Sequence, residues 1–71
     1  MMLYAAVFEK TETGWSAYVP DLPGLGIAAA TLGEAEILIR EGIEFHIEGL
    51  RHDGLPIPAP AAQVKQIAIP A

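Results

Sequence analysis

The segment Pro20–Gly24, which reads PDLPG, constrains the fold of this chain more than any other feature, because a helix start follows it seven residues later. Its two prolines and its glycine end a strand and turn the backbone sharply. The Thr-Leu-Gly-Glu that begins at Thr31 has the spacing of a capping box. We therefore expect a hairpin that leads through a tight turn into a long helix. The residues expected to build this geometry are Pro20, Asp21, Pro23, Gly24, Thr31 and Glu34.

The size of the chain limits how much core it can bury. Its 71 residues predict a single domain over residues 1–71. A domain of this size buries only about 60% of its unfolded surface. The sequence has no cysteine and two histidines, which excludes disulfides, thiolate metal sites and a histidine-based zinc cage. With an apolar fraction of 52%, self-association into a dimer or tetramer is the expected source of further stability, and we expect no cofactor.

The charge and hydropathy patterns restrict the partners. The net charge is −5, and the four basic residues are scattered, so we expect no direct binding of nucleic acid. No apolar run approaches the roughly 20 residues of a membrane span. The N-terminus lacks the pattern of a secretion signal. We therefore expect a cytoplasmic protein that does not associate with a membrane.

Hydrophobic periodicity predicts an α+β chain in the order β-β-β-α-β. The helix is expected to lie over one face of the sheet, with Gly42 at a close approach and Gly54 in a left-handed cap. The proline-rich residues 55–62 predict a stiff, extended connector. Strands are expected at about residues 3–10, 15–19, 25–30 and 64–69, and the helix at about 32–52.

The order and spacing of several short motifs resemble the HicB-like antitoxin family of bacterial toxin–antitoxin systems. The resemblance runs from Tyr4 to about Pro60. No single motif is specific, but their order is. They are Phe8-Glu9-Lys10, Gly14 with an aromatic residue after it, Val19–Gly24, Thr31-Leu32 with Glu34-Ala35, Glu48-Gly49-Leu50, Asp53-Gly54 and Pro56-Ile57-Pro58.

The resemblance implies both a fold and a function. It implies a two-layer, partial ribonuclease H-like unit, with one helix on a four-stranded sheet of order 3-2-1-4. It also implies an antitoxin that neutralises a small RNA-cleaving toxin of the HicA type by binding it. Many members carry a C-terminal DNA-binding module, and nothing in these 71 residues matches one. The alternative from another class is a solitary oligomeric binding or scaffold module without a cognate toxin.

A catalytic role finds no support in the sequence, so we do not expect an enzyme. A ribonuclease H-type nuclease needs several carboxylates that converge on two metal ions. The first expected strand offers only Glu9, and the last offers none. His46 falls on the expected sheet-facing side of the helix, and His52 lies near the helix C-terminus, where a charged ring interacts favourably with the helix dipole.

The expected outer side of the helix is acidic. Glu34, Glu41 and Glu48 recur every seven residues, and Arg40 is spaced to neutralise Glu36 and Glu44. One interpretation is an ordinary solvated face. The other is a surface that steers a basic toxin toward this chain, with Glu41 and Glu48 in contact.

Apolar residues also fall off the expected buried face of the helix. They are Ile37, Leu38, Phe45 and Ile47, and we interpret them as a contact surface, with Leu38 and Phe45 at a seam between copies of the chain. Leu22 is the one apolar side chain of the Pro20–Gly24 turn without an evident local role. We therefore name Leu22 as a further partner contact, although the turn residues around it have sufficient backbone reasons to be present.

Overall fold

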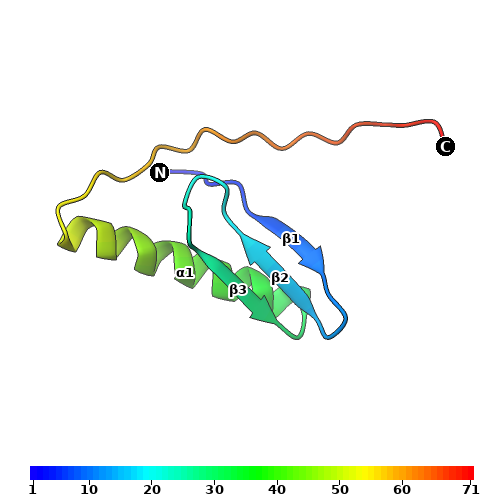
Figure 1. Ribbon diagram of the computed structural model, residues 1–71, viewed down its shortest axis with the longest axis horizontal. Helices are drawn as coiled ribbons and strands as arrows, with labels where there is room; N and C mark the ends of the chain where they lie inside the picture. Colours follow the sequence, from blue (N-terminus) through cyan, green and yellow to red (C-terminus); the bar gives the residue numbers. More distant parts are fainter.

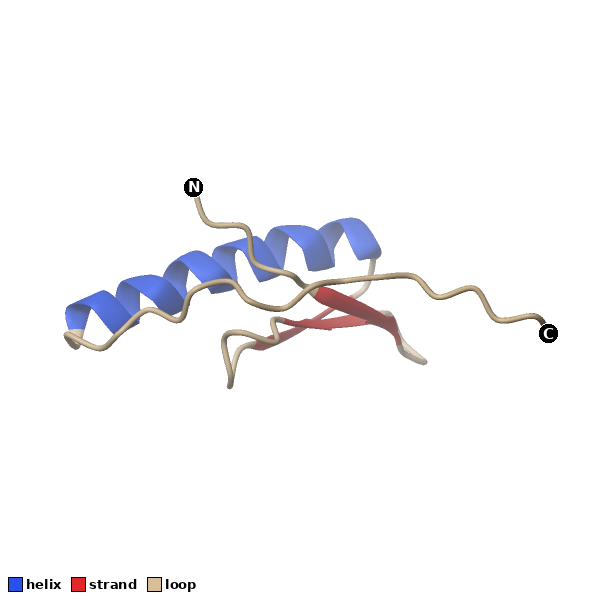
Figure 2. Ribbon diagram, turned by 90° about the horizontal axis from the view of Figure 1, so that it is seen from above, coloured by secondary structure: helices blue, strands red, loops and turns tan.

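The computed structural model describes residues 1–71 as a small antiparallel sheet with one helix across it (Figure 1). The sheet has three strands in the order β1-β2-β3, and α1 covers one of its faces (Figure 2). The helix contacts β3 most extensively and β2 next, so β1 lies toward the less covered side. The elements are β1 (Val7–Lys10), β2 (Trp15–Tyr18), β3 (Gly26–Ala29) and α1 (Leu32–His52).

A four-residue loop joins β1 to β2, as the sequence predicts. The register pairs Lys10 with Trp15, and the Thr11 amide donates to the Gly14 carbonyl at 2.8 Å. Gly14 is buried, and a Cβ atom placed on it would lie 2.1 Å from the backbone oxygen of Ala29. Only glycine therefore allows the end of β3 to pass this close to the hairpin.

Two consecutive turns carry the chain from β2 to β3. The Leu22 amide donates to the Val19 carbonyl at 3.0 Å, and the Leu25 amide donates to the Leu22 carbonyl at 3.3 Å. Each turn has a proline at its second position, where the fixed proline φ suits a β-turn. Gly24 follows with φ +89°, the positive value that a type II turn requires at its third position.

Local capping sets both ends of α1. The Thr31 hydroxyl accepts from the Glu34 amide at 3.1 Å, which is the threonine half of the predicted capping box. At the other end Gly54 has φ +67°, as predicted for a left-handed cap. The Leu55 amide donates to the Leu50 carbonyl and the Gly54 amide to the Arg51 carbonyl, which together form a Schellman motif.

The hydrophobic core is small and lies between α1 and the β2–β3 side of the sheet. Leu22 is completely buried, and it clusters with Ala17, Val19 and Ile39. Gly42 packs closely on Leu25, since a Cβ there would lie 2.9 Å from Cδ1 at the end of that flexible side chain and 3.9 Å from Cγ2 of Ile27 in β3. Partly buried side chains extend the cluster, namely Tyr4, Ala6, Phe8, Leu25, Ile27 and Ile43.

The predicted fourth strand is wrong. The sheet has three strands, so the four-stranded, partial ribonuclease H-like sheet of order 3-2-1-4 is not formed. Residues 63–71 run extended beside no strand, and they project away from the rest of the chain (Figure 1). Alternating apolar residues make a segment suitable for a sheet, but they do not specify which edge it joins. The connector before this segment directs it away from β1.

Replacing Leu22 tests the description of the core. We expect Leu22→Ala to lower the free energy of unfolding by about 2–5 kcal/mol, because it leaves a cavity beneath α1. Phe45→Ala is the control, since it removes a larger but exposed side chain and should change stability by no more than about 0.5 kcal/mol. Urea unfolding followed by circular dichroism measures both. Equal, small effects would contradict a core role for Leu22.

Candidate functional site

The side of α1 that faces away from the sheet combines apolar and acidic side chains. Phe45 is 82% exposed and Ile37 is 61% exposed, although both are large apolar residues. Leu38 is 39% exposed and lies two turns from Phe45 on the same side of the helix. We call this surface the outer face of α1, and it comprises Glu34, Ile37, Leu38, Glu41, Phe45 and Glu48.

The charge of the outer face is only weakly neutralised. Nη1 of Arg51 lies 3.5 Å from Oε1 of Glu48, and both side chains are largely exposed, so solvent screens the pair. The predicted ion pairs of Arg40 with Glu36 and Glu44 are wrong, because neither approaches within 4.0 Å. Glu34 and Glu41 form no ion pair either, so the outer face keeps a negative potential.

Two residues named from the sequence lie elsewhere than expected. Leu22 has no exposed surface, so the structure places it in the core and not at a surface that a partner could touch. Its role was missed because its contacts come from α1, which is distant in the sequence. Ile47 is partly buried and lines a groove on the β1 side of α1, away from the outer face.

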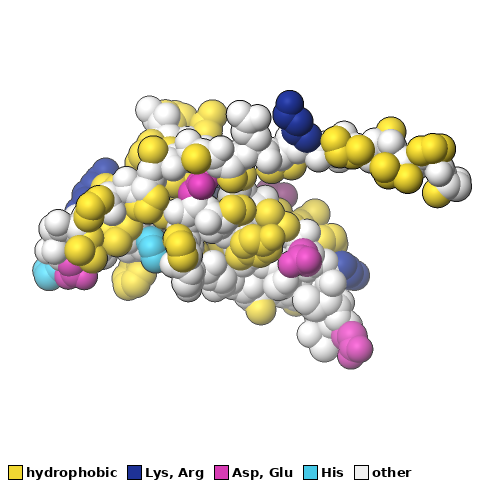
Figure 3. Space-filling view, turned by 45° about the horizontal axis from the view of Figure 1, so that its top comes forward, with side chains coloured by type: hydrophobic (Ala, Val, Ile, Leu, Met, Phe, Trp, Pro, Cys, Tyr) yellow, Lys and Arg dark blue, Asp and Glu magenta, His cyan; other side chains and the backbone are white.

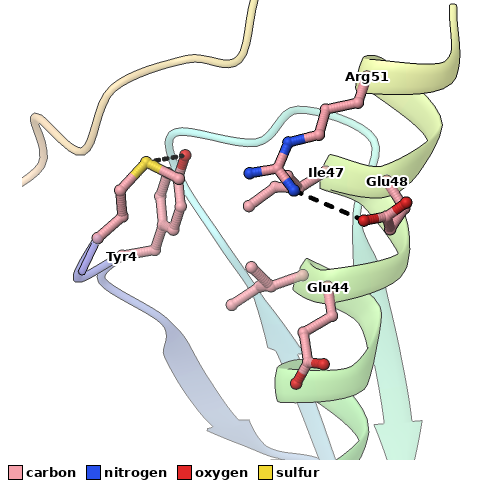
Figure 4. A pocket seen from close by; sticks show the side chains of 7 residues that line it. Tyr4, Glu44, Ile47, Glu48 and Arg51 are labelled. Atoms are coloured by element: carbon pink, nitrogen blue, oxygen red, sulfur yellow. Dashed lines mark hydrogen bonds and ion pairs between the residues drawn. The ribbon is translucent and has the colours of Figure 1, made fainter.

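This groove separates the N-terminal segment and β1 from the adjacent side of α1. It consists of two neighbouring cavities of about 390 and 440 Å³, both lined by Met2, Tyr4, Ile43 and Glu44. Tyr4 forms one wall, and the helix forms the other (Figure 4). We call it the β1 groove; its further lining residues include Ala6, Phe8, Glu36, Ile39, Arg40, Ile47, Glu48 and Arg51.

The connector after α1 is held by Tyr4, which precedes β1, and by Asp21, which follows β2. The Tyr4 hydroxyl donates to the Pro58 carbonyl. Oδ2 of Asp21 accepts from the amides of Ala61 and Ala62, each at 3.0 Å. Asp21 therefore fixes the point at which the connector ends and the chain projects away from the sheet and helix. A turn accounts for an aspartate at this position, but no sequence pattern indicates a hydrogen-bond partner 40 residues away.

These two hydrogen bonds also affect the titration of the carboxyl group. The amides of Ala62 and Ala61 stabilise the charged form and lower the pKa of Asp21 below its ordinary value of 3.8. The carboxylate is therefore ionised at neutral pH, and ionisation gives it its full strength as an acceptor.

The remaining ionisable side chains do not assemble a site. No three His, Asp or Glu side chains lie close enough together to hold a metal ion. His46 is partly buried on α1, and Nδ1 of the exposed His52 lies 3.3 Å from Oδ1 of Asp53. No helix in the structure is both long and apolar enough to span a membrane.

Comparison with known proteins decides the family. The model of the family described as "HicB_like antitoxin of bacterial toxin-antitoxin system" matches residues 4–70, nearly the whole chain. The chain belongs to the HicB-like antitoxin family. The matched range includes both the Pro20–Gly24 turns and the extended residues after Ala62.

A phage protein is similar to this HicB-like chain. The uncharacterized 14.9 kDa protein in the rep-hol intergenic region of Haemophilus phage HP1 (strain HP1c1) is 44% identical over 57 residues. The match covers 80% of this chain and 43% of the phage protein. The chain thus spans less than half the length of that relative.

Loss of the Asp21 carboxylate should release the connector. In Asp21→Ala we expect faster hydrogen exchange of the Ala61 and Ala62 amides, measured by NMR at neutral pH. Because folding lowers this pKa, the bond contributes fully above pH 3.8 and is lost as the pH falls through the lower folded-state value. Glu12→Ala is the control, an exposed carboxylate without a bond to the connector. Unchanged exchange in Asp21→Ala would contradict the anchor.

Proposed function

We propose that this HicB-like chain neutralises a small RNA-cleaving toxin of the HicA type by covering it with the outer face of α1. The observation that carries the proposal is the exposed Phe45, with the exposed Ile37 about two turns before it, on a helix face that also holds acidic residues. Exposed apolar side chains surrounded by charge are typical of protein-binding surfaces. The family match supports an antitoxin role.

The electrostatics suit a basic partner. The chain carries a net charge of −5, and an RNA-cleaving protein needs a basic surface to hold phosphates. Attraction between the two would raise the rate of encounter, whereas the apolar residues would slow dissociation. In this role the chain acts by binding, in the cytoplasm, and it catalyses nothing.

We also propose that the chain self-associates. Only six of its 71 residues are buried, and large apolar side chains remain exposed outside α1 as well. A domain of this size without disulfides or metals gains stability by associating with another chain. Self-association without any toxin would instead favour a solitary scaffold module.

Reversing charges on the outer face tests the toxin proposal. We expect Glu41→Lys with Glu48→Lys to slow association with a purified HicA-type toxin by at least about tenfold at low salt. The difference should shrink at high salt, where charges are screened. Surface plasmon resonance with a catalytically inactive toxin measures it, and relief of growth arrest on co-expression reports neutralisation.

The matched control is Glu9→Lys with Glu12→Lys, which changes the net charge equally but on β1 and its hairpin loop. This variant should keep most of the association rate. If both variants slowed association equally, the slowing would come from the net charge of the chain and not from the outer face. No binding of that toxin by the unmodified chain would overturn the proposed function.

A further inference from the structure

β1 has a free edge that could pair with a further strand, and residues 63–69 are extended but pair with no strand of their own chain. β1 and β3 are the two edges of the sheet, but α1 lies over β3, whereas the β1 groove adjoins β1. A strand laid beside β1 would place every second side chain into this groove. The fold therefore leaves one strand position open, with apolar side chains already gathered beside it.

Residues 63–69, which we call the tail strand, have what that position requires. Their side chains alternate, with Lys65, Ile67 and Ile69 on one face. Ile67 is 74% exposed and Ile69 is 73% exposed, and no backbone group of the tail strand is hydrogen-bonded within the chain. Figure 3 shows the apolar side chains of the tail standing clear of the rest of the molecule.

We propose that the tail strand of one copy pairs with the β1 edge of a second copy, which completes the β1 groove. In this arrangement Ile67 and Ile69 enter the groove against Ile39 and Ile43. Two copies related by a two-fold axis exchange their tail strands reciprocally. Within each chain the sheet keeps its three strands.

The occupant is a second copy because the connector directs the tail strand away from its own chain. Tyr4 and Asp21 hold the connector at Pro58 and at Ala61–Ala62, directly before the tail strand begins. Prolines at positions 56, 58 and 60 stiffen the connector, so it does not fold back easily. The longest dimension of the chain, 48 Å, reflects this projecting segment.

Charge complementarity supports the same pairing. Lys65 is the only charged side chain after Asp53, and it shares a face with Ile67 and Ile69. The rim of the groove carries the carboxylates of Glu36, Glu44 and Glu48 and the guanidinium groups of Arg40 and Arg51, so acidic groups outnumber basic ones, and Arg40 pairs with neither Glu36 nor Glu44. A tail strand that places its isoleucines in the groove therefore brings Lys65 to an acidic rim.

This inference rests on the proposed self-association and not on toxin binding. The outer face of α1 and the β1 groove meet at Glu48, but Ile37, Leu38 and Phe45 line neither cavity of the groove. The apolar contacts of the two partners are therefore distinct, and both partners can bind at once. Failure of toxin binding and failure of strand exchange are consequently separable in experiments on the same variants.

The test uses full-length chain in sedimentation equilibrium. We expect Ile67→Asp with Ile69→Asp to raise the dissociation constant of the dimer at least about a hundredfold, because two apolar side chains lose their burial. Val64→Asp with Ala68→Asp is the matched control on the opposite, solvent-facing side of the tail strand, and it should have a much smaller effect. Circular dichroism checks that both variants keep the fold, and toxin binding should be unchanged.

An isotope-filtered NOE experiment on a mixture of labelled and unlabelled chains identifies the occupant. We expect intermolecular NOEs from the Ile67 and Ile69 methyl groups to Phe8 and Ile43. A monomeric unmodified chain, NOEs confined to one chain, or equal effects of the two double variants would each overturn the proposal.

Discussion

The burial of Leu22 beneath α1 is the contact on which the rest of the structure depends. Two proline turns bring this side chain into the cluster with Val19 and Ile39, where it loses all exposed surface. The contact fixes α1 over β2 and β3, because the turns lie at the end of one and the start of the other. As a consequence the helix leaves β1 poorly covered and the β1 groove open.

Features set by neighbouring residues could be predicted from the sequence, whereas features set by distant contacts could not. The helix over residues 32–52, the Thr31 cap, the left-handed Gly54 and the four-residue hairpin loop all depend on local geometry. The prediction of a fourth strand was wrong because alternation at residues 64–69 indicates an extended segment but does not specify the sheet edge with which it pairs. Leu22 was misplaced for the same reason, since its partner Ile39 is 17 positions away.

Among the candidate site residues, exposure on α1 was predictable from helical periodicity. Phe45 and Leu38 lie on the outer face as their spacing indicates, but Ile47 faces the β1 groove. The anchoring role of Asp21 had no sequence signal, because its partners are backbone amides of Ala61 and Ala62. The helix thus separates two surfaces with different chemistry. One is acidic and apolar and suits a basic toxin, and the other is a groove that suits an extended apolar strand.

We propose that one chain buries too little apolar surface on its own and that a second copy completes it. Thermal unfolding of the unmodified chain over about a hundredfold range of protein concentration tests this claim most directly. If association supplies the missing burial, the unfolding midpoint rises with concentration. A midpoint that is independent of concentration, together with a monomeric mass across the same range, would contradict it.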